Sequence, residues 1–424
     1  MSKAIQQERP LDWFNIGFVV VFPVVAIAAA IWYGLNYGIT WRELSAATVI
    51  WVLTGLGITA GYHRLFAHRG YAAHPSVRAA LAVLGAAACQ NSAIAWCSDH
   101  RYHHSDTDTD GDPYDATRGF FYSHMGWILY KGLRGDIYKN VPDLRRDPIL
   151  AWQHRHWLTI AVLTNAALVS LAALVLGNWL GMLIIAGMLR VVVVQHFTFC
   201  INSLAHMWGS RPYSTATSSR DNWLLSLVTL GEGYHNYHHS FEWDYRNGPR
   251  WFNWDPTKWL IWSLSKVGLA RSLRRVPLDV VLQRRFEQGR SGFATRLSEW
   301  SESKAAEWRQ LRAEKREQIR TRREDFMDGV RKGQVALRDQ LLAAETALEL
   351  ELQELKTLRQ ALADALRRLA AETSDELREA LENELHHLQR ALKDAQRAAR
   401  SSLKSWELLM REYGRGMHPA VATP

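Results

Sequence analysis

Residues 13–35 read WFNIGFVVVFPVVAIAAAIWYGL, an apolar run long enough to cross a lipid bilayer. A transmembrane helix needs about 20 mostly apolar residues. The run exceeds the apolar core of a signal peptide, contains Pro23 and is followed by no small-residue cleavage site, so we expect it to be retained as a span. Three further runs of this character lie at 44–62, 156–177 and 179–201. The sequence therefore predicts an all-α integral membrane protein with four transmembrane helices.

The distribution of lysine and arginine predicts the orientation of these spans. Short links at 36–43 and 177–178 join the spans in pairs, whereas the basic residues lie in the segment 131–155 and in the C-terminal part. Basic residues are enriched in the cytoplasmic loops of membrane proteins. We therefore expect a multi-pass protein of the inner (cytoplasmic) membrane, with both termini on the cytoplasmic side.

A fifth apolar run, SVRAALAVLGAAACQNSAIAWC at 76–97, is ambiguous. Its length suits a span, but it carries Arg78, Gln90 and Asn91. We interpret it as an interfacial or re-entrant helix.

Nine of the 17 histidines fall in four short groups near the ends of apolar runs. The groups are HRLFAH, DHRYHH, NSLAHMWG and EGYHNYHH. Their histidines are His63, His68, His100, His103, His104, His206, His235, His238 and His239. Two separate HxxHH patterns together with an HxxxxH pattern rarely arise by chance, so we expect these nine to be metal ligands.

The spacing within the triplets indicates two metal ions. On a helix, residues three or four apart share a face, so His100 can meet a metal together with His103 or with His104. The adjacent pair differs by about 100° around the axis and points toward two centres. The second triplet has the same spacing. Imidazole suits iron, copper, zinc and nickel, and a structural zinc site usually includes cysteine. We therefore favour a pair of redox irons that activates dioxygen.

The ligand set also predicts the topology. The nine histidines meet only if all four groups lie on one side of the membrane. A span at 76–97 would separate His63 and His68 from His100, so this run is not expected to cross. Four transmembrane helices beneath a cytosolic helical cap result.

Five strings resemble the membrane fatty acid desaturase family, specifically its acyl-CoA delta-9 (stearoyl-CoA type) members. The resemblance covers about residues 10–265. The strings are GITAGYHRLFAHR (57–69), QNSAIAWCSDHRYHHSDTDTDGDPY (90–114), GFFYSHMGW (119–127), NSLAHMWG (202–209) and GEGYHNYHH (231–239).

The resemblance implies a di-iron centre with the nine histidines as ligands and a kinked tunnel for an acyl chain. By the same likeness, Asn202 holds a water on one iron. Two positions depart from the family pattern. Ser98 stands where animal members carry an arginine near CoA, and Phe199 replaces a tunnel tryptophan.

The resemblance also implies substrate-binding residues. Gln90, Trp96 and Thr198 match the residues that line the kink beside the metals, and Asn91 and Asp99 match positions that contact the CoA end.

Trp51 is a candidate for the closed end of the tunnel. It lies twelve residues before His63, which corresponds to about 18 Å along a helix. The family has a bulky residue there. An ordinary packing or lipid-facing tryptophan is an equally good interpretation.

The expected reaction needs a bound metal, a substrate and an external source of electrons. Removal of hydrogen from an unactivated methylene is beyond side-chain acids and bases, so a metal-bound oxidant is required, with long-chain acyl-CoA as the expected substrate. The chain has no haem-binding HPGG segment and no dinucleotide fingerprint, and its three cysteines are too few for a ferredoxin cluster. We therefore expect an external electron donor, a reductase with ferredoxin or a cytochrome.

Two rival functions remain at this stage. One is a membrane di-iron desaturase or hydroxylase that acts on lipid-bound acyl chains or alkanes. The other is a metal-binding membrane scaffold whose function resides in the C-terminal part. The net charge of +9 is spread along the chain, so no nucleic-acid partner is expected.

The C-terminal part is charged and has a helical period. Leu341, Leu348, Leu355, Leu362 and Leu369 recur every seven residues, with Leu352 and Leu366 at the alternate seam position. This pattern predicts a coiled coil, as two antiparallel helices or a self-associating stalk that forms a homo-oligomer. A solvated accessory tail is the simpler alternative.

We therefore expect a membrane desaturase domain at 1–280, a charged helical coiled-coil extension at 281–412 and a tail at 413–424.

Overall fold

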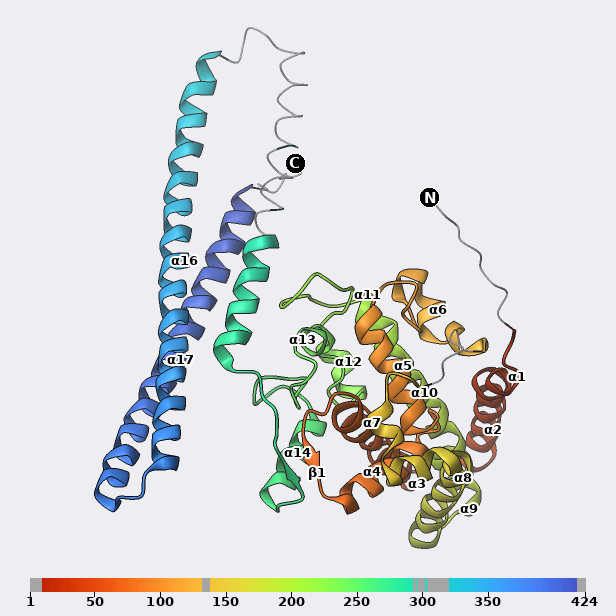
Figure 1. Ribbon diagram of the computed structural model, residues 1–424. Helices are drawn as coiled ribbons and strands as arrows, with labels where there is room; N and C mark the ends of the chain where they lie inside the picture. The colour runs from red at the N-terminus through yellow and green to blue at the C-terminus, as the bar shows by residue number, and fades with distance from the viewer. Residues whose placement is uncertain (1–9, 132–137, 293–294, 296–301, 303–319, 418–424) are drawn as a thin grey trace. The chain divides into compact units, whose positions relative to one another are not determined.

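The computed structural model describes residues 10–131, 138–292, 295, 302 and 320–417. The chain forms two compact units, residues 1–275 and 276–424 (Figure 1).

The first unit contains four helices long and apolar enough to cross a membrane, which confirms the predicted fold class. They are Trp13–Tyr37, Trp41–Ala67, Pro148–Leu176 and Trp179–Met207. Their elements are α1 (Trp13–Ile16), η1 (Gly17–Val21), α2 (Phe22–Tyr37), α3 (Trp41–Leu56), η2 (Gly57–Ala67), α8 (Pro148–Leu176), α9 (Trp179–Gly181), η5 (Met182–Leu189), α10 (Arg190–Asn202) and α11 (Leu204–Met207). The elements η1, η2 and η5 are π-helical segments within the spans.

The third span begins eight residues before the predicted 156. Asp147 caps it, since its side chain accepts hydrogen bonds from the backbone N–H groups of Ile149 (3.0 Å) and Leu150 (3.3 Å). Pro148 occupies the first helical position, where a missing N–H costs nothing. The helix bends at His156, the first residue of the predicted span. The apolar pattern therefore marked the part beyond the bend and missed the polar first turns.

The prediction of a single helix over 76–97 is wrong. The chain forms α4 (Pro75–Ala87) and α5 (Ala93–Asp106), separated by a turn in which Cys89 and Asn91 have positive φ angles of 58° and 75°. A helix cannot continue through left-handed residues. Ser92 then caps α5 by accepting from the Ala95 N–H at 3.2 Å.

Helix α4 packs closely against the spans. It contacts α8 and η2, and its residues Leu81, Ala82 and Ala86 are buried. A Cβ atom at Gly57 of η2 would lie 2.3 Å from the Gly85 nitrogen, so the two backbones touch at glycines. This packing fixes the position from which α5 starts.

Short elements complete the first unit. The strands β1 and β2 pair antiparallel, with Ala72 opposite Arg271 and Ala73 opposite Ala270. The elements are β1 (Ala72–Ala73), η3 (Ala116–Arg118), α6 (Phe120–His124), η4 (Gly126–Leu129), α7 (Pro142–Arg145), α12 (Trp223–Val228), α13 (His235–Ser240), α14 (Pro256–Lys266) and β2 (Ala270–Arg271).

In its described residues, the second unit contains a helix at 278–292 and two long helices, α16 (Arg320–Ala371) and α17 (Asp375–Met417). The long helices run antiparallel, because Ser402 bonds Glu351 while Arg368 bonds Glu384 nearer the connecting turn (Figure 1).

The core of the second unit follows the leucine repeat in part. Leu341, Leu348 and Leu355 are buried as the heptad predicts. Leu366, expected in the seam, is 49% exposed, and Ala365 is buried in its place. The repeat therefore marks the contact face correctly near the middle of α16 but not near its end, and coiled-coil supercoiling stays a prediction.

Candidate metal centre

The nine clustered histidines come from separate elements of the first unit and converge. His63 lies in η2, and His68 directly follows this element. Helix α5 carries the first triplet, α11 carries His206 and α13 carries the second triplet.

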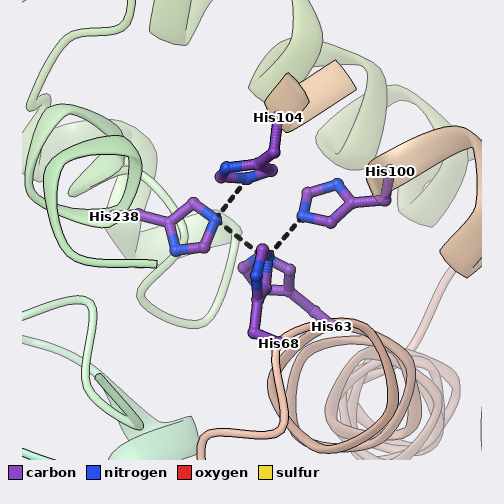
Figure 2. A group of neighbouring side chains, drawn as sticks. All are labelled: His63, His68, His100, His104 and His238. Atoms are coloured by element: carbon purple, nitrogen blue, oxygen red, sulfur yellow. Dashed lines mark hydrogen bonds between the residues drawn. The ribbon is translucent and has the colours of Figure 1, made fainter. Parts of the chain in front are cut away.

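The rings form two groups. In each, the potential ligand atoms lie within 4.8 Å of one another. The five-histidine group, shown in Figure 2, consists of His63, His68, His100, His104 and His238. The four-histidine group consists of His103, His206, His235 and His239.

Helix geometry explains how each triplet divides. His100 and His104 are four residues apart and enter the same group, while His103 turns away into the other. On α13, His235 and His239 share the four-histidine group and His238 enters the five-histidine group. Each triplet thus bridges the two groups.

Carboxylates on the outer side of the two groups orient three of the rings. The Nδ1 atoms of His63, His103 and His104 contact Glu232 (2.7 Å), Asp112 (2.9 Å) and Glu242 (3.2 Å), respectively. A carboxylate accepts only, so each of these Nδ1 atoms carries the proton, and the Nε2 lone pair faces inward.

His206 is oriented in the same way through a hydroxyl. Its Nδ1 lies 2.7 Å from the Ser218 Oγ, whose own proton goes to Asp108 at 2.5 Å. The hydroxyl therefore accepts from His206, which again leaves the Nε2 lone pair facing inward.

The inward nitrogens crowd one another. The Nε2 atoms of His68 and His100 are 2.7 Å apart, those of His104 and His238 2.8 Å, and those of the contacting pairs in the four-histidine group 3.1–3.2 Å. Two lone pairs at such distances repel, so each of these contacts needs a proton or a metal cation between the two nitrogens. The donor set therefore fits metal ions, one in each group.

Burial keeps the rings neutral and ready to bind metal. Burial lowers the pKa of seven rings that lie outside the spans, because a charged imidazolium is poorly solvated there. Neighbouring rings lower the pKa further, because two protonated rings would repel each other. The affected residues are His68, His100, His103, His104, His235, His238 and His239.

Glu232 is the centre of a buried ionic network. It accepts from Arg64 at 2.8 Å and from Asn247 at 2.6 Å, and its other contact is with the His63 Nδ1 at 2.7 Å. Arg64 also pairs with Asp255 at 2.9 Å. Burial alone would raise the pKa of Glu232, but Arg64 and His63 lower it below its ordinary value, so the carboxylate stays charged.

A cavity of about 1630 Å³ adjoins both groups. His63, His100, His103 and His235 form part of its wall. The structure places every residue predicted to contact substrate, and Asn202, along this cavity. These residues are Trp51, Gln90, Asn91, Trp96, Asp99, Thr198 and Asn202.

The wall beside the histidines is held by side-chain contacts. Gln90 donates to Thr198 at 2.7 Å and accepts from the Trp96 indole at 3.3 Å. Trp96 in turn stacks on His100, with ring centroids 4.8 Å apart. The two departures from the family pattern, Ser98 and Phe199, also line the cavity.

The sequence reasoning missed the orienting partners Glu232, Asp112, Glu242 and Ser218. A signal existed for two of them, because Glu232 precedes the second triplet by three residues and Glu242 follows it by three. Ser218 lies in a stretch rich in serine and threonine, where the sequence distinguishes no single residue.

Comparisons with known proteins agree with this geometry. Residues 43–261 match the family model described as "Fatty acid desaturase". The chain is 44% identical over 276 residues to a "Probable acyl-CoA desaturase" of Schizosaccharomyces pombe, covering 63% of this chain and 56% of that one. It is 40% identical over 285 residues to "Acyl-CoA desaturase 1" of Saccharomyces cerevisiae, covering 66% and 54%. The chain thus spans a little over half the length of these two relatives.

A third relative carries a different substrate name. The "sn-2 palmitoyl-lipid 9-desaturase" of Nostoc sp. (strain 36) is 35% identical over 284 residues, which covers 65% of this chain and 95% of that one.

Proposed function

The chain belongs to the fatty acid desaturase family, and from this premise we propose that it is an acyl-CoA desaturase that forms a cis double bond at the Δ9 position. The substrates are a saturated long-chain acyl-CoA, dioxygen, two electrons and two protons. The products are the monounsaturated acyl-CoA and two waters.

One observation carries the proposal. Two adjoining sets of inward-facing imidazoles border a cavity of about 1630 Å³ whose wall is mostly apolar. A methylene chain held in such a cavity passes the metal centre at a distance fixed by its anchored head.

The metal ions, which we propose to be two irons, supply the oxygen-activating chemistry when bound. The chain's own residues hold them through the nine histidines, with Asn202 as a further ligand through water. Because His103 and His104 enter different groups, α5 would supply ligands to both ions.

The cavity residues orient the acyl chain. The Gln90–Thr198 hydrogen bond and Trp96 form a rigid wall beside the histidines, against which the chain bends. Trp51 packs edge-on against Phe197 at 5.8 Å, and we assign it as the stop for the methyl end. Asn91 and Asp99 face the CoA end.

Cell topology and partners complete the proposal. The histidine side of the spans faces the cytoplasm, and the electrons come from a separate ferredoxin or cytochrome with its reductase. Self-association through α16 and α17 stays a prediction.

Expression in a host that requires unsaturated fatty acids tests the proposal. We expect growth to be rescued and gas chromatography to show a cis-Δ9 monounsaturated product. The His238→Ala and His239→Ala variants should lose the product, while His387→Ala, at an exposed position of α17, should retain it. Rescue by either cluster variant would contradict the enzymatic proposal.

A desaturase of lipid-bound acyl chains is the second candidate, favoured by the name of the Nostoc relative. Supplying the purified chain, dioxygen and a reduced ferredoxin or cytochrome with stearoyl-CoA or with stearoyl phospholipid separates the two. Product from the phospholipid alone supports the second candidate, and an alcohol in place of an alkene indicates a hydroxylase.

A further inference from the structure

Residues 250–275 expose more large apolar side chains than a water-facing loop accounts for. The exposed fractions reach 86% at Trp251, 57% at Phe252 and 51% at Trp262. Trp254, Trp259 and Val267 are also exposed. None of these residues belongs to the four spans. Exposed large apolar side chains gathered in one short segment point to an interaction site.

The segment is anchored firmly from its buried side. Thr257 bonds Thr59 of η2 at 2.7 Å, Asp255 pairs with Arg64, and Ile261 is fully buried. The Lys258 ammonium donates to the carbonyls of Gly248, Arg250 and Asn253. The exposed rings are therefore held in place on a rigid element, α14 and its flanks.

The contact with η2 places α14 at a defined depth. Thr59 lies 18 residues after Trp41, the first residue of its span, which is about 27 Å along a helix. The hydrocarbon layer of a bilayer is about 30 Å thick. If Trp41 lies at one interface, as tryptophans at span ends do, Thr59 and the start of α14 lie at the other.

The charges of the segment suit a lipid headgroup layer. Arg250, Lys266, Arg271, Arg274 and Arg275 are exposed. The one carboxylate between 250 and 275, that of Asp255, is buried and paired with Arg64. Lys266 lies over the Trp262 ring at 5.2 Å and Arg250 over that of Phe252 at 5.7 Å. Tryptophan beside exposed cations is the composition of interfacial helices that bind anionic lipid.

We propose that residues 250–275 form an interfacial element that lies in the headgroup layer of the leaflet on the histidine side of the membrane and binds anionic phospholipid. The aromatic rings enter the boundary between headgroups and acyl chains, and the cations face the phosphates. The same element also supports the metal centre, because its Asp255 pairs with Arg64 and Arg64 pairs with Glu232, which contacts His63.

Photo-crosslinking identifies what covers the element. The full chain carries p-benzoylphenylalanine in place of Trp262, is reconstituted in nanodiscs of phosphatidylcholine and phosphatidylglycerol, irradiated and analysed by mass spectrometry. Leu174, 72% exposed on the α8 span, is the positive control position, and the exposed loop residue Asp110 is the negative one.

We expect lipid adducts at 262 with a yield close to that at 174 and about tenfold above that at 110. A yield at 262 as low as at 110 overturns the proposal, as do adducts that join 262 to residues 276–424 or to a second copy of the chain.

Charge reversal tests the lipid class. The combined variant Arg271→Glu, Arg274→Glu and Arg275→Glu should lower the phosphatidylglycerol share of the adducts at 262 about threefold. An unchanged share overturns the assignment to anionic lipid. Bound metal, measured in every sample, verifies that the fold is intact.

Discussion

At the scale of single residues, the carboxylates that contact the histidines differ in how firmly they can hold a ring. A partner at Nδ1 fixes the tautomer and the ring plane, so that Nε2 is available to a metal. Glu232 differs from Glu242 in its surroundings. Glu232 is 3% exposed and pairs with Arg64, whereas the Glu242 side chain is 52% exposed.

The Glu232→Gln variant tests this positioning role. The amide keeps the shape but removes the charge that holds His63 and Arg64. We expect metal affinity of the five-histidine group to fall about 10- to 100-fold. Plasma mass spectrometry of the purified protein should show metal content falling from two ions per chain toward one.

The matched control is Glu242→Gln. Because water already competes for this carboxylate, the metal content should change little. Equal losses in both variants would contradict a special role for the buried network.

The Trp51→Ala variant should accept acyl chains that are longer than those accepted by the unaltered protein. Gly55 and Leu230 line the cavity beside Trp51, so removal of the indole enlarges the cavity at this place. We expect activity on a 20-carbon relative to an 18-carbon acyl-CoA to rise about tenfold. Trp51→Phe should shift the ratio only slightly, and an unchanged ratio in Trp51→Ala would contradict its role as the stop.

At the scale of elements, the turn between α4 and α5 aims the first triplet. Cys89 adopts a left-handed conformation that costs a side-chain-bearing residue about 1–2 kcal/mol. Cys89→Gly relieves this cost, whereas the branched Cys89→Val increases it. Since both variants lose the thiol, we expect the melting temperature of the glycine variant in detergent to exceed that of the valine variant by about 3–6 °C. The reverse order would show that the turn is not strained.

Some features of these elements could be predicted from the sequence and others could not. The spans follow from length and apolarity, and the division of His103 from His104 follows from 3.6 residues per turn. The break in 76–97 had a weak signal, since Asn91 is of a residue type that tolerates a left-handed turn but no glycine or proline lies between 88 and 92. The pairing of Glu232 with Arg64 was hidden, because 168 residues separate them and only the fold brings them together.

At the scale of the whole molecule, the two units have separate cores. The core of the second unit combines Phe286 with Trp406, whose ring centroids are 4.7 Å apart, and with leucines of α16. The metal centre and the cavity consist of residues of the first unit.

Trp406→Ala should therefore act on the second unit alone. Loss of a buried tryptophan costs about 3–5 kcal/mol, so limited proteolysis should cut α16 and α17 faster. Metal content and product formation should stay at the level of the unaltered chain. A loss of metal in this variant would show that the units depend on each other.

The way the histidines alternate between elements has a consequence for biosynthesis. His63 is translated 175 residues before His238, yet both belong to the five-histidine group. At about 5–20 residues per second, roughly 9–35 s pass between them on the ribosome. Neither ligand set is therefore complete until the second triplet has been made, so a metal ion that needs a complete set can bind only after most of the first unit has been synthesised.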